Sequence, residues 1–177
     1  TRKYGTGVVR VELTLDFLSD RSIDQEPVPH TLILEMAPLD IMPHSVYTFL
    51  EMVDNHLYDG CSFVINALGI IKMAPLPYEK GPWGSAKQMD QNFRKFGLET
   101  VSFREYSESY KHEQYTVGFA ADGSPDFYIN TMDNSEEHAG EPCFARIVSG
   151  LETVAKMEAE PLRSGMWIKK RIGIKKA

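Results

Sequence analysis

The sequence has only two cysteines, Cys61 and Cys143, among its 177 residues. They lie far apart and form neither a CxxC motif nor a metal-spaced pair, which excludes a disulfide-rich scaffold and a cysteine-based metal centre. We expect both to be small buried apolar residues, with a bridge between them as the less favoured alternative. At this length a chain can bury a core without disulfides or metals, so we expect a single domain over residues 1–177.

Long apolar runs are also missing. No stretch approaches the roughly 18 apolar residues of a membrane-spanning helix, so this domain is not expected to insert into a membrane. Positive charge is in the minority, because 19 Lys and Arg stand against 25 Asp and Glu and give a formal net charge of −6. This balance argues against capture of nucleic acid. The basic cluster Lys169, Lys170, Arg171, Lys175 and Lys176 is expected to be an exposed strand face with a solvated tail.

The common motifs of catalysis and metal binding are absent as well. The five histidines form neither an HExxH motif nor a pair at i and i+4, so we expect no metal ion and no cofactor. Gly123-Ser124-Pro125 lacks the flanking glycines of a nucleophile elbow. The sequence also starts without Met or a signal-like segment. We therefore expect a monomeric domain of a longer protein, whose compartment the sequence does not indicate.

What is present is a pattern of short strands. Alternating apolar and polar residues from Val9 to Phe17 predict a strand with one buried face. The stretch from Leu18 to Pro29 predicts a turn, and His30 to Met36 a second strand. Pro43 suits the first turn of a helix that should end near residues 55–56.

The rest of the chain continues this pattern. Residues 61–73 predict two strands joined by a bend at Leu68-Gly69, and residues 74–102 a long surface loop with a short helix near 87–96. A second main helix should bury Leu151, Val154 and Ala155. Further strands are expected at residues 115–121, 127–131, 143–148 and 168–174. The order predicts a mostly β fold, a closed antiparallel barrel of about eight strands capped by two α-helices.

Several stretches, in this order, resemble the cyclophilins, a family of peptidyl-prolyl cis-trans isomerases. They are Pro43–Phe49, Leu57–Phe63, Phe103 with Lys111-His112, Phe127–Thr131 and Ile147–Met157. The resemblance covers most of the chain. It implies the cyclophilin barrel and a groove for a proline-containing peptide.

The resemblance also implies a catalytic arginine after the Ser-Phe pair, where it is thought to donate to the proline nitrogen. Such a donor weakens the partial double bond behind the rotation barrier of about 18–20 kcal/mol. Here the strand reads Ser62-Phe63-Val64-Ile65-Asn66, so Ile65 stands in the place of the arginine. Isoleucine cannot donate a hydrogen bond. No catalytic residue is therefore predicted.

The other groove positions implied by the resemblance are also altered. Gly69-Ile70-Ile71-Lys72-Met73 stands where the family has Gly-Phe-Met-x-Gln, so an aromatic wall becomes aliphatic and Met73 replaces the glutamine. Ala121 replaces an asparagine that binds the substrate backbone. Ala120 matches the family. The remaining implied groove residues are Phe127 as the floor of the proline pocket, His138 in a shifted position, and Pro142 in place of a histidine.

Asn66 and Lys72 are candidate substitute donors, although a solvent-facing role for Lys72 is favoured. We expect a cyclophilin-like domain that has lost efficient isomerase activity and binds a protein or a proline-containing peptide. The alternatives are a weak isomerase that grips the twisted amide in an apolar pocket, and a groove with an unrelated function.

Overall fold

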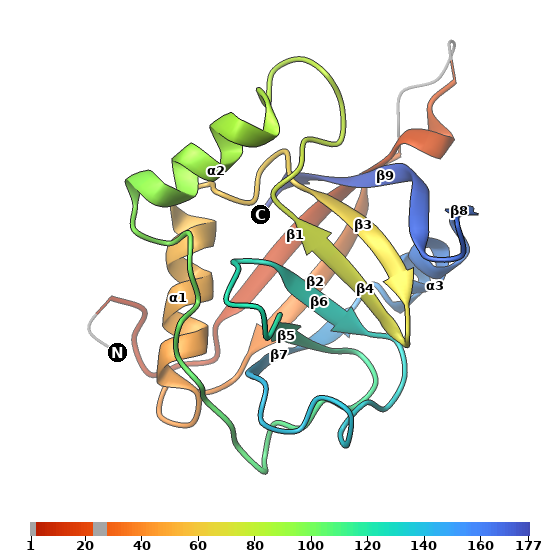
Figure 1. Ribbon diagram of the computed structural model, residues 1–177. Coiled ribbons are helices and arrows are strands. Elements are labelled where there is room, and N and C mark those ends of the chain that lie inside the picture. The colour runs from red at the N-terminus through yellow and green to blue at the C-terminus, as the bar shows by residue number, and fades with distance from the viewer. Residues whose placement is uncertain (1–2, 23–27) are drawn as a thin grey trace.

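The computed structural model describes residues 3–22 and 28–177 and shows a mostly β fold (Figure 1). The strands are β1 (Arg10–Phe17), β2 (His30–Met36), β3 (Ser62–Ala67), β4 (Ile70–Ala74), β5 (Thr116–Phe119), β6 (Phe127–Asn130), β7 (Cys143–Ser149), β8 (Leu162–Arg163) and β9 (Trp167–Lys176). The helices are α1 (Pro43–Asp54), α2 (Ala86–Lys95) and α3 (Leu151–Glu158), with a 3-10 turn at Leu18–Asp20. Part of the predicted turn, residues 23–27, lies outside the described residues.

Eight of the strands form a closed antiparallel barrel, as the sequence predicted. The order is β1-β2-β7-β5-β6-β4-β3-β9, and β9 pairs back onto β1. Ile172 of β9 makes the closure, because it lies opposite both Phe17 of β1 and Phe63 of β3. The short strand β8 is attached to β9 alone among the described strands. A closed barrel leaves few unpaired strand edges, so strands as short as these can form a stable sheet.

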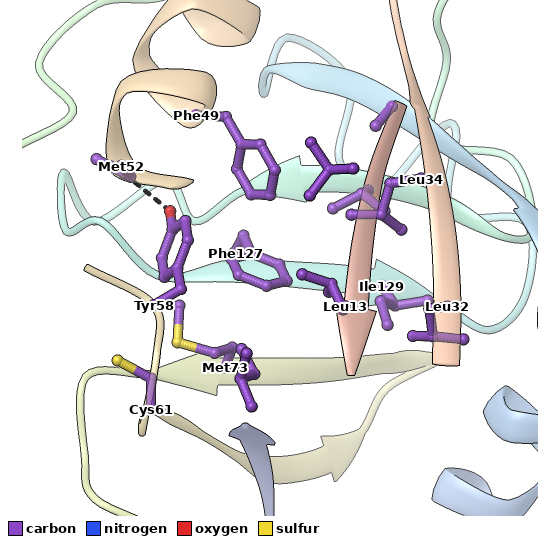
Figure 2. Close-up of a cluster of buried hydrophobic side chains, with 14 of the residues drawn as sticks. Leu13, Leu32, Leu34, Phe49, Met52, Tyr58, Cys61, Met73, Phe127 and Ile129 are labelled. Atoms are coloured by element: carbon purple, nitrogen blue, oxygen red, sulfur yellow. Dashed lines mark hydrogen bonds between the residues drawn. The ribbon is translucent and has the colours of Figure 1, made fainter. Parts of the chain in front are cut away.

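The barrel interior and one end form a single apolar core. Leu13, Leu15 and Phe17 are buried there, which confirms the alternation predicted for the first strand. Helix α1 covers the end of the barrel and inserts Phe49, whose ring lies 5.4 Å from that of Phe127 and 4.8 Å from that of Phe144 (Figure 2). Aromatic pairs of this kind stabilise a core beyond the area that they bury.

Helix α2 lies within the long loop after β4, where the sequence predicted a short helix. Ser85 and Gln88 form a capping box at its start. Met89 and Phe93 are buried on one face, and the Phe93 ring lies 5.8 Å from that of Tyr58. The loop is therefore packed on the barrel, and the predicted short helix stands beside the two main helices.

Helix α3 buries a different stripe from the one predicted. Val154 is buried as expected, but Leu151 and Ala155 are exposed, and Met157 is buried instead. Gly150 is the N-cap residue before the helix. It has φ 95° and lies so close to β2 that a Cβ would be 2.3 Å from the Thr31 carbonyl oxygen. This tertiary contact fixes which face of α3 meets the barrel.

The cysteines and the helix lengths were also the subject of sequence predictions. Cys61 and Cys143 are both free and buried, as predicted. Within residues 3–22 and 28–177, none of the helices has the length and apolar character needed to cross a membrane.

Candidate functional site

The outer surface of the barrel carries a row of residues that are direct cross-strand neighbours. Going from β9 through β3, β4 and β6 to β5, the pairs are Trp167 with Ile65, Ile65 with Lys72, Lys72 with Tyr128, and Tyr128 with Gly118. Direct neighbours in a sheet share one face. The flanking residues of β4 and β6 belong to the core, so this row faces outward. We call it the outer row.

Ile65 lies in this row between Trp167 and Lys72. Its side chain is partly exposed, and that of Trp167 beside it is 40% exposed. The pairing of β3 with β4 has a bulge between Phe63 and Ile65. Because the bulge interrupts the strict alternation of side chains, Phe63 points into the barrel while Ile65 points outward. The position that the resemblance assigns to the catalytic arginine thus holds an aliphatic side chain on the outer face.

Lys72 is the neighbouring cation, and its charge is already engaged. Its Nζ lies 3.1 Å from Asp126 Oδ2 and 3.5 Å from Asp122 Oδ2. Burial works to lower the pKa of Lys72, but the two carboxylates outweigh it and raise the pKa overall. Burial raises the pKa of Asp126, and the pairing with Lys72 offsets only part of this effect. At least two of the three Lys72 N–H donors are thus directed at carboxylates.

Tyr128 is tied into a polar network on the same face. Its hydroxyl donates to Glu141 Oε2 over 2.6 Å, and its ring lies 5.1 Å from that of His138 and 5.6 Å from that of His112. His138 Nδ1 also lies 3.2 Å from Glu141 Oε2. Burial, reinforced by Glu141, raises the pKa of the Tyr128 hydroxyl. The phenol therefore stays neutral and holds the loop before β7 against the barrel.

His112 completes this network in its neutral form. Its Nε2 donates to the Glu141 carbonyl over 3.0 Å, and its Nδ1 accepts from Asn130 Nδ2 over 3.0 Å. The ring lies over Gly118, where a Cβ would be 2.5 Å from His112 Cε1. Burial lowers the pKa of His112, because it disfavours the charged form of the ring.

This arrangement predicts a loss of stability in mild acid. The unfolded chain protonates His112 near its ordinary pKa of about 6.5, whereas the folded chain does so only at lower pH. The contribution of His112 to the free energy of unfolding is therefore complete above a pH of about 6.5. It is lost as the pH falls below that value, at up to about 1.4 kcal/mol per pH unit. Urea unfolding between pH 7.5 and 5 should show this slope. His112→Gln, which keeps a donor and an acceptor, should remove the His112 part of it, whereas His44→Gln at an exposed site should keep it. Equal slopes in the two variants would contradict the assignment.

A hollow opens beside the network. It has a volume of about 200 Å³, and Ala120, Ala121 and Pro142 line it together with Phe103 and Glu141. Pockets for small molecules usually measure about 300–1,000 Å³, so this hollow suits one part of an extended peptide better than an enclosed ligand. Three of the residues predicted for the groove therefore meet here.

The other predicted groove residues divide between the two faces of the sheet. Ile65 and Ile70 face outward, and His138 lies beside Tyr128. The side chains of Ile71, Met73 and Phe127 instead point into the barrel and are completely buried. The physical reason is the strict alternation of β4 and β6, which turns every second side chain inward.

Phe127 illustrates this inward placement. Its ring lies 5.0 Å from that of Tyr58 and 5.7 Å from that of Phe63 (Figure 2). The structure thus places Phe127 in the core rather than on the floor of an open pocket. Asn66 is not in the outer row either, since its Nδ2 donates to the Glu158 carbonyl over 3.2 Å.

The sequence reasoning missed four residues of this face, namely Asp126, Tyr128, Glu141 and Trp167. Alternation along β6 was the available signal for Tyr128, because an inward Phe127 requires its neighbour to point outward. The contacts of Trp167 and Glu141 depend on strand pairing and loop placement, which no local pattern reveals. Within the described ranges, no three His, Cys, Asp or Glu side chains gather where they could hold a metal ion.

Comparisons with known proteins agree with this geometry. A family model described as cyclophilin type peptidyl-prolyl cis-trans isomerase/CLD matches residues 27–177. No curated protein matches the sequence. The fold is similar to a crystal structure of a cyclophilin type peptidyl-prolyl cis-trans isomerase from Cryptosporidium parvum, with a TM-score of 0.70, 16% identity and 96% of each chain covered. A structure of the same kind of protein from that organism, in the presence of the dipeptide Ala-Pro, gives a TM-score of 0.63 and 19% identity, covering 82% of this chain and 90% of the other.

Proposed function

The chain belongs to the cyclophilin-type peptidyl-prolyl cis-trans isomerase family, and we propose that it is a peptide-binding or protein-interaction domain that has lost efficient isomerase activity. The observation that carries this proposal is Ile65 in the outer row, between Trp167 and Lys72. A donor at that position would pull the nitrogen lone pair out of amide resonance, and an aliphatic side chain has none to offer.

The neighbouring polar groups do not supply the missing donor. The Lys72 ammonium is held by Asp126 and Asp122, and the Tyr128 hydroxyl donates to Glu141. Electrostatic stabilisation needs donors that already point at the reacting group, because reorienting them costs free energy during the reaction. The polar groups of this face therefore support its structure rather than the isomerisation step.

The same face keeps features that suit a peptide. Ile65 and Ile70 offer apolar surface, and the hollow beside Ala120, Ala121 and Pro142 can take a side chain. The related structure in the presence of Ala-Pro makes a proline-containing peptide the first ligand to test. Partner proteins with an exposed X-Pro segment are the corresponding class of natural ligand.

Peptide binding can be mapped by NMR on the labelled protein. A blocked Ala-Pro peptide should shift the backbone amide signals of Ile65, Ala120 and Ala121, and a peptide with Ala in place of Pro should shift them less. Ala121→Arg, which fills the hollow, should weaken binding at least tenfold. Ala155→Arg, at an exposed site on α3, should leave it unchanged. Absence of any shift on the outer face would refute the proposed binding site.

A weak isomerase is the second candidate. An apolar surface that binds the twisted amide more tightly than the planar one would still favour the transition state. The partly exposed aliphatic side chains of Ile65 and Ile70 are the observation in its favour. The two candidates differ in turnover, not in binding.

A further inference from the structure

A second and larger hollow lies between the loop over residues 77–86 and strand β9. Its volume is about 620 Å³, and it is open to solvent. Four cationic residues line it: Lys80, Lys169, Lys170 and Arg171. We call it the basic hollow. The sequence alone suggested only a solvated strand face for these β9 residues.

Among the described residues, the lysines of the basic hollow have no carboxylate partner. Glu79 is the acidic residue of its lining, and its Oε2 is 2.5 Å from Arg21 Nη1. Across residues 3–22 and 28–177, Lys80, Lys169 and Lys170 form no ion pair. A local excess of positive charge on a chain with a net charge of −6 marks a surface that attracts anions.

The walls of the hollow are held in place. Arg171 Nη1 donates to the Pro77 carbonyl over 2.7 Å, which ties the loop to β9. The Tyr78 ring lies flat over Gly173, where a Cβ would approach it to 2.3 Å. Burial raises the pKa of Tyr78 to about 12, so its hydroxyl adds no negative charge at neutral pH. A preformed surface loses little conformational entropy when a ligand binds.

We propose that the basic hollow binds an acidic segment of a partner protein, independently of the proline-peptide face. The lysine ammonium groups supply charge complementarity to Asp and Glu side chains. Leu18 and Pro77 provide apolar surface beneath the peptide backbone. The open shape of the hollow admits an extended chain. Binding should weaken as salt rises, because exposed charges are screened.

The test uses a blocked ten-residue peptide of alternating Glu and Gly, titrated while the Trp fluorescence is followed. Trp83 is a suitable reporter, since its ring lies 6.0 Å from that of Tyr78 in the wall of the hollow. The Glu peptide should bind, and the same peptide with Gln should not. Reversing two charges in Lys169→Glu/Lys170→Glu should weaken binding at least tenfold.

The matched control is Lys175→Glu/Lys176→Glu, which makes the same change in charge at exposed positions of the same strand. It should alter the affinity less than threefold. If Lys169→Glu/Lys170→Glu lowers the unfolding midpoint, Lys169→Gln/Lys170→Gln serves in its place. Equal losses in the two double variants, or binding of the Gln peptide, would overturn the proposal. Tighter binding of an equally charged polyphosphate would assign the hollow to phosphate instead.

Discussion

Replacing Phe127 by Ala is expected to lower the free energy of unfolding by about 3–5 kcal/mol. The ring is completely buried and lies within 5.7 Å of the rings of Phe49, Tyr58 and Phe63. Its removal would leave a cavity at the junction between α1 and the barrel, and a rigid closed barrel cannot collapse to fill it. Most of the stability of a domain of this size could be lost in one substitution.

Denaturant unfolding followed by circular dichroism measures this change. Phe96→Ala is the control, because that ring is 47% exposed and its removal should cost less than about 1 kcal/mol. The experiment also separates the two interpretations of Phe127. If Phe127→Ala abolished peptide binding while costing less than about 1 kcal/mol, Phe127 would line an accessible pocket rather than the core.

The strands were predictable because their signals are local. Alternation in Val9–Phe17, the bend at Leu68-Gly69 and Pro43 at the start of a helix each depend on neighbouring residues. These features agree with β1, the β3–β4 hairpin and α1. The closed barrel followed from their order and from the family resemblance.

The outward or inward direction of single side chains was harder to predict. A match to a family motif does not tell whether a side chain points into the barrel or outward. Phe127 was matched to the groove in this way, but its side chain points into the barrel. The pairing of Lys72 with Asp126, and of Tyr128 with Glu141, joins segments that are distant in the sequence. Such contacts arise from strand register and loop placement, so no spacing rule reveals them.

Ile65→Arg is expected to raise the isomerase kcat/KM at least tenfold. A guanidinium at this position would project from the outer row and could donate to the nitrogen of a bound X-Pro amide. Removal of one such preorganised donor costs other enzymes about 10²- to 10³-fold, and the altered neighbours here should limit the gain. Ile65→Met adds length without a donor and should leave the rate unchanged. An equal increase in both variants would mean that the donor is not what the site lacks.

We propose that the barrel is kept while the isomerase chemistry is lost. A protease-coupled assay on an X-Pro peptide, with the unaltered protein beside an active cyclophilin, tests it most directly. The structure predicts a kcat/KM more than tenfold below that of the active enzyme, because Ile65 offers no donor and Lys72 is held by two carboxylates. Turnover within tenfold of the active enzyme would contradict the account and favour an isomerase that works through its apolar surface.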